Sequence, residues 1–174
     1  MRTLIQNCRI ISPGIDIPEG YLIIRDDKIE EVGEGGVSGT FDNVIPADGL
    51  IAAPGFIDIH SHGRSNFDFC DIAPEAFAVI GRRKREDGVT GFLATSLTVS
   101  MDDLRDFCRL AERYKKDVTD GAALLGVHLE GPCINPSCAG AQNPAFLREP
   151  DIAIVDELNA ISPVKKVTFS PELP

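Results

Sequence analysis

The residues of this chain that could do chemistry are its three histidines and one glutamate, and they fall in two short segments. Residues 58–63 read DIHSHG, and residues 128–132 read HLEGP. Side chains alternate along an extended chain, so His60 and His62 point the same way and can close on one metal ion. His128 and Glu130 share a direction for the same reason. Glu130 follows the apolar run LLGVHL, where an unpaired carboxylate is costly to bury, and a bound metal would remove that cost.

Simpler roles for these residues stay open at this point. A single histidine near a strand end, such as His128, is usually a hydrogen-bonded residue of the core or surface. Glu130 would also be satisfied by a salt bridge to a nearby Arg or Lys. The five cysteines are an odd number without paired metal-type spacing, so we expect reduced thiols that serve in packing.

Strands and helices alternate from residue 50 onward, and they must position these side chains. Apolar runs predict strands over 50–59, 91–97, 122–130 and 166–170, the first of them buried on both faces. Amphipathic patterns predict helices over 74–87, from Ser100 to about 116, and over 151–160. Such alternation is typical of parallel βαβ units, in which ligands bind beyond the carboxyl ends of the strands. All three histidines lie at or next to such ends.

The first fifty residues follow a different pattern. Residues 4–11, 21–25 and 28–32 are β-rich runs, and no segment here keeps a helical period over three turns. We therefore predict a small all-β segment over 1–50, without chemistry of its own, and an α/β segment over 51–174.

Charge and hydropathy exclude several classes of function. The chain has 174 residues with 17 Lys+Arg against 27 Asp+Glu, a formal charge of −10. This balance argues against nucleic-acid binding and against docking on anionic membranes, both of which need basic surfaces. The longest apolar runs are too short to span a bilayer, and the first residues lack a secretory signal. We expect a cytoplasmic protein.

Longer motifs around the two segments resemble a known family. The run PGFIDIHSHG over 54–63 looks like the first-strand signature of the amidohydrolase superfamily. The run HLEGP with INP over 134–136 and GAQNP over 140–144 is narrower, and it resembles the N-acetylglucosamine-6-phosphate deacetylase family. The resemblance covers essentially the whole chain. It implies an α/β fold: the N-terminal half of a metal-dependent (β/α)8 TIM-like barrel, preceded by a small β-sandwich segment.

The resemblance also implies roles for particular residues. Glu130 matches the family's ligand of the catalytic divalent metal, which is Zn²⁺, Fe²⁺ or a similar ion. His60 and His62 match the pair that binds a second metal in binuclear members, so one or two ions are expected. Ala141 and Gln142 match the loop dipeptide that contacts the sugar, although the family more often has His at the second position. Arg64 departs from the glycine-rich run usual after the His-x-His.

The implied reaction is hydrolysis of the acetamide of N-acetylglucosamine 6-phosphate, in amino-sugar catabolism, by a homodimer of the full-length protein. A closed (β/α)8 barrel takes about 250 residues, and this chain supplies about four strands and three helices. We therefore expect a truncated chain that is inactive alone, with no catalytic residue of its own, because the family's catalytic Asp would lie beyond Pro174. Two alternatives are another amidohydrolase, similar to dihydroorotases or deaminases, and a non-catalytic, self-associating fragment.

Overall fold

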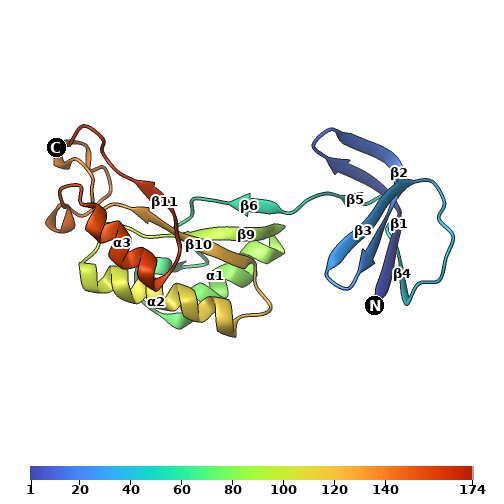
Figure 1. Cartoon of the computed structure of the whole chain (residues 1–174), viewed down its shortest axis with the longest axis horizontal. Helices are drawn as coiled ribbons and strands as arrows, with labels where there is room; N and C mark the ends of the chain where they lie inside the picture. Colours follow the sequence, from blue (N-terminus) through green and yellow to red (C-terminus); the bar gives the residue numbers. More distant parts are fainter. Residues whose placement is uncertain (174) are drawn as a thin grey trace. The chain divides into compact units, whose positions relative to one another are not determined.

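The computed structural model describes residues 1–173, which divide between Pro54 and Gly55 into two compact units (Figure 1). Each unit has its own sheet and its own buried residues. The two units are described separately below.

The first unit is one five-stranded sheet. Its strands are β1 (Arg2–Ser12), β2 (Ile15–Arg25), β3 (Lys28–Glu34), β4 (Asn43–Pro46) and β5 (Ile51–Ala52). The order is β3-β2-β1-β4; β2 runs antiparallel to both β1 and β3, whereas β4 and β5 run parallel to β1. Every element described in this unit is a strand, as we predicted for this part of the chain. Because β5 pairs with β1, residues 51 and 52 belong to this sheet, although we had placed them in the following segment.

The second unit is a curled parallel sheet of α/β class, as predicted. The order is β11-β10-β9-β6, and all neighbours are parallel. The strands are β6 (Phe56–Asp58), β9 (Val89–Thr95), β10 (Ala123–Glu130) and β11 (Val164–Thr168), and a short hairpin is formed by β7 (Gly63–Arg64) and β8 (Phe67–Asp68). The helices are α1 (Pro74–Glu86), α2 (Met101–Asp117) and α3 (Ile152–Ile161), with 3-10 turns η1 (Phe69–Asp71), η2 (Pro136–Cys138) and η3 (Pro144–Phe146).

The three helices lie side by side on one face of this sheet (Figure 1). Their starts have local causes: Pro74 occupies the first turn of α1, where its missing N–H is not needed. The side chains of Ser100 and Asp151 accept hydrogen bonds from backbone N–H groups in the first turns of α2 and α3. Between helices and sheet lies one core with four stacked or tilted aromatic rings at its centre, from Phe69, Phe77, Phe92 and Phe107.

One predicted strand is wrong. We expected residues 50–59 to form a single strand buried on both faces, but the chain divides this run between β5 of the first sheet and β6 of the second. Pro54 and Gly55 interrupt it. The part that becomes β6 pairs only with β9 and is an edge strand, so Phe56 is 72% exposed and Ile57 63% exposed. Among the described residues, no helix is long and apolar enough to cross a membrane.

Glu112 ties α2 to the end of α3. Its Oε1 accepts hydrogen bonds from Lys115 Nζ at 2.6 Å and from the hydroxyl of the buried Ser162 at 2.8 Å. Burial acts to raise the pKa of Glu112, but these two donors outweigh it and hold the pKa below its ordinary value of 4.5.

We expect Glu112→Gln to lower the free energy of unfolding by about 1–3 kcal/mol at neutral pH, because it removes a charged acceptor from two donors. A carboxyl whose pKa is depressed by folding stabilises the protein above its unfolded pKa, so the difference from wild type should shrink as pH falls below about 4.5. Urea unfolding followed by the helical circular dichroism signal measures this. Asp156→Asn, at an exposed position of α3, is the control; a difference that persists unchanged in acid contradicts the assignment.

Candidate metal centre

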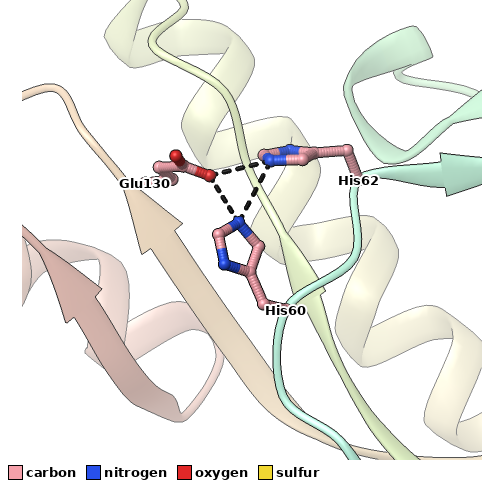
Figure 2. Close-up of side chains that lie close together, drawn as sticks. All are labelled: His60, His62 and Glu130. Carbon is pink, nitrogen blue, oxygen red and sulfur yellow. Dashed lines mark hydrogen bonds and ion pairs between the residues drawn. The ribbon is translucent and has the colours of Figure 1, made fainter.

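Three side chains meet beyond the carboxyl ends of β6 and β10 (Figure 2). His60 Nε2 and His62 Nε2 each lie 2.7 Å from Glu130 Oε2, and the two nitrogens are 3.3 Å apart. Among residues 1–173, this is the one group of His, Cys, Asp or Glu side chains whose ligand atoms are close enough to share a metal ion. Segments seventy residues apart in sequence therefore bring together the three residues predicted as metal ligands.

The electrostatics of the cluster favour an ionised carboxylate. The side chain of Glu130 is only 21% exposed, and this burial acts to raise its pKa. The hydrogen bond from His60 and the positive potential of both imidazoles outweigh burial, and they hold the pKa of Glu130 below its ordinary value. Glu130 therefore brings a negative charge to the point where two imidazole nitrogens converge.

The donor set fits a divalent metal ion. Two histidines and one glutamate form a known ligand set of catalytic zinc sites, which keep one further position open. Zinc–nitrogen bonds of about 2.0–2.1 Å in tetrahedral geometry set ligand atoms about 3.3–3.4 Å apart. The two Nε2 atoms match this spacing at 3.3 Å, whereas Glu130 Oε2 lies at hydrogen-bond distance, 2.7 Å, from both. Three polar atoms, two imidazole nitrogens and one carboxylate oxygen, here crowd around one point. A cation at that point would be coordinated by all three atoms.

A partly buried ion pair supports the loop that carries His60. Asp58, the last residue of β6, accepts the His60 N–H through Oδ1 at 3.1 Å and contacts Lys84 Nζ through Oδ2 at 2.6 Å. Lys84 lies on α1, is only 4% exposed, and places its ammonium 5.5 Å from the centre of the Phe92 ring. Burial acts to raise the pKa of Asp58, but Lys84 and the His60 amide hold it below its ordinary value.

His128 is a completely buried residue between neighbouring strands. Its Nδ1 lies 3.2 Å from Thr95 Oγ1 and its Nε2 lies 2.8 Å from Thr168 Oγ1. Burial is the main cause that lowers its pKa to about 4, so the imidazole is neutral at physiological pH. Its ring lies edge-to-face with the ring of His60, with centroids 4.7 Å apart. His128 is thus the hydrogen-bonded core histidine that the simpler reading expected.

The predicted sugar-contact dipeptide lies in the long loop after β10. Gln142 accepts a hydrogen bond from the Thr98 N–H through Oε1 at 2.7 Å, and Ala141 is exposed. Thr98 follows the carboxyl end of β9, so this bond joins the loops after two neighbouring strands. Since a backbone N–H must face the amide oxygen, the NH₂ end of Gln142 is the end turned away from Thr98.

Sequence reasoning missed Asp58, Lys84 and Thr95 as supports of the cluster. A signal for Lys84 was available: it follows Phe77, Ile80 and Gly81 at helical spacing, so a charge stands on the apolar face of its helix. Arg64, which had no explanation in the sequence, forms an ion pair with Asp87 at the end of α1.

Solved structures of other proteins share the fold of this chain. A solved amidohydrolase shares the fold, with a TM-score of 0.55 over 91% of this chain at 16% identity. No family model matches the chain. The chain is 34% identical to N-acetylglucosamine-6-phosphate deacetylase of Bacillus subtilis over 97% of its own length. This confirms the narrower resemblance that its motifs indicate.

Other relatives have the same class of activity in their names. N-acetylgalactosamine-6-phosphate deacetylase of Escherichia coli O157:H7 is 33% identical over 75% of this chain. A mutant deacetylase from Mycobacterium smegmatis, solved in complex with N-acetyl-D-glucosamine-6-phosphate, matches 99% of the chain with a TM-score of 0.81 and 26% identity. The chain spans only 44% of the Bacillus relative and 44% of the Mycobacterium chain.

We expect the two members of the Asp58–Lys84 pair to contribute unequally to the free energy of unfolding. Asp58→Asn should lower the free energy of unfolding by about 3–5 kcal/mol, because it leaves the buried ammonium without a counter-charge. Lys84→Met should cost less, about 1–3 kcal/mol, because the remaining carboxylate is 31% exposed and keeps contact with water. The double variant should recover part of the loss. Urea unfolding of the three variants measures this, and equal, additive losses would count against a buried pair.

Proposed function

We propose that a protein containing this chain is a metal-dependent hydrolase of amino-sugar catabolism that cleaves the acetamide of N-acetylglucosamine 6-phosphate to glucosamine 6-phosphate and acetate. The observation that carries this proposal is the convergence of His60, His62 and Glu130 in a chain similar to such deacetylases over almost its whole length. The Mycobacterium relative with its sugar phosphate bound supports the substrate class.

In this proposal, His60, His62 and Glu130 hold one or two divalent ions, such as Zn²⁺ or Fe²⁺. Such an ion supplies a Lewis acid that polarises the acetamide carbonyl and activates water. The ionised Glu130 brings the negative charge that anchors it. Gln142 is the candidate sugar contact: with its oxygen engaged by Thr98, its NH₂ group is what it can donate to a substrate hydroxyl, and the exposed Ala141 beside it leaves room for the ring.

The remaining architecture is part of the same proposal. We expect the first unit to be one layer of a small β-sandwich and the second unit to be half of a (β/α)8 barrel. The part of the relatives that this chain does not span would then provide further strands, the proton-transferring Asp and further ligands. We also expect the complete protein to be a homodimer. β6 and β11 are the edge strands of the sheet. Because such edges can pair with another chain, we also expect the 174-residue chain to associate with itself.

Metal binding is testable on the chain itself. Glu130→Gln should weaken Zn²⁺ binding by at least about 100-fold, because a direct ligand contributes more than the 10–100-fold typical of its outer partners. Competition with a chromophoric chelator measures this. Glu86→Gln, which removes an exposed carboxylate paired with Arg83 on α1, is the matched control. Equal affinity in wild type and Glu130→Gln would exclude this glutamate as a ligand.

Activity requires the longer protein. We expect a protein with the full span of the relatives to release acetate from N-acetylglucosamine 6-phosphate, and Glu130→Gln to reduce kcat/KM by at least about 100-fold. Assays with N-acetylgalactosamine 6-phosphate, dihydroorotate and nucleoside substrates separate this activity from those of other amidohydrolases. Turnover by the 174-residue chain alone would contradict the expectation that activity requires the part of the relatives that this chain does not span.

A further inference from the structure

Thr95 lies between the two segments that carry the proposed metal ligands. It is the last residue of β9, the strand that separates β6 from β10, and it is completely buried. Its Oγ1 accepts the Ser61 N–H at 3.0 Å, and its own N–H donates to Ser61 O at 3.1 Å. Ser61 stands between His60 and His62, so a single residue holds the two peptide groups that join these histidines.

The same strand end also holds the Glu130 side of the cluster. Thr95 is in register with His128 of β10, and its hydroxyl lies 3.2 Å from His128 Nδ1. The next residue, Ser96, donates its N–H to His128 O at 2.9 Å and accepts the Glu130 N–H through Oγ at 3.3 Å. The end of β9 therefore fixes both ligand-bearing segments without placing a ligand atom in the cluster.

The proton of the Thr95 hydroxyl has a defined role in this arrangement. Because Oγ1 already accepts the Ser61 N–H, its own hydrogen is free to be donated to His128 Nδ1. In that tautomer His128 carries its proton on Nε2 and donates it to Thr168 Oγ1, 2.8 Å away. One chain of hydrogen bonds thus crosses from the His-x-His loop through β9 and β10 to β11, and it uses each buried donor.

We propose that the Thr95 hydroxyl is a positioning group of the metal centre, which sets the separation of His60 and His62 from Glu130. The inference rests on the metal function proposed above. Metal ligands must be held to within about 0.5 Å of their binding positions for tight binding. The Thr95 hydroxyl is the side-chain group that holds the backbone between His60 and His62. The backbone bond from the Thr95 N–H to Ser61 O is kept when Thr95 is replaced by Val, Ala or Ser, so these variants test the side chain alone.

The test is the Zn²⁺ affinity of the 174-residue chain and its variants, measured by chelator competition. Thr95→Val keeps the branched shape but removes the hydroxyl, and we expect about 10–100-fold weaker binding, as for other groups that orient metal ligands. Thr95→Ser keeps the hydroxyl and should restore most of the affinity. Thr90→Val is the matched control, because Thr90 lies on the same strand with its hydroxyl on Phe56 O at 3.4 Å, and it should bind like wild type.

A second readout separates positioning from general stability. Thermal unfolding with and without Zn²⁺ should show a smaller zinc-induced rise in Tm for Thr95→Val, whereas a purely structural role would lower both Tm values and leave the rise unchanged. If Thr95→Val fails to fold, the pair Thr95→Ala and Thr95→Ser decides, since both lose the methyl group and only one loses the hydroxyl.

The outcomes distinguish this inference from the proposed function. Tight zinc binding by wild type, with equal affinity in Thr95→Val or in the Thr95→Ala and Thr95→Ser pair, overturns the role of Thr95 and leaves the metal centre standing. Absence of zinc binding by wild type overturns both. Weaker binding and a reduced zinc-induced rise in Tm, both recovered in Thr95→Ser, support the positioning role.

Discussion

A carboxylate withdrawn from water needs positive or hydrogen-bonding partners, and Glu130 has its partners only because two distant segments end at the same edge of one sheet. The parallel order β11-β10-β9-β6 brings the end of β6 and the end of β10 to that edge, with β9 between them. His60 and His62 then complete the surroundings of Glu130. The helices, the core and the Asp58–Lys84 ion pair hold these strand ends in place.

The supports of the cluster have different physical characters. On the β6 side, Lys84 and Asp58 form a charged pair at the helix–sheet boundary. Asp58 also accepts a hydrogen bond from the His60 amide and so restrains it. On the β9 side, Thr95 acts through neutral hydrogen bonds in a fully buried environment. Charged pairs are strong but costly to bury, while neutral bonds depend on register. The cluster is thus held from two sides by interactions that respond differently to substitution.

Local signals in the sequence predicted most of the second unit. The helix starts expected at Pro74, Ser100 and Asp151 agree with the structure to within a residue. The parallel alternation also placed His60, His62 and Glu130 at one edge. The prediction that the strand over 50–59 is buried on both faces was wrong, because an apolar run does not reveal whether a strand has one neighbour or two. Phe56 and Ile57 read as buried, yet only β9 pairs with them.

The parts of the site that sequence could not predict depend on tertiary register. Nothing in the residue type of Thr95 distinguishes it from Thr90 on the same strand; only the pairing of β9 with β10, interrupted by an irregularity near Gly126, sets Thr95 opposite His128. A β-strand places side chains on alternate faces, so a slip of one residue would turn the Thr95 hydroxyl away from Ser61 and His128. The proposed ligands are visible as residue types, whereas the geometry that brings them together comes from this register.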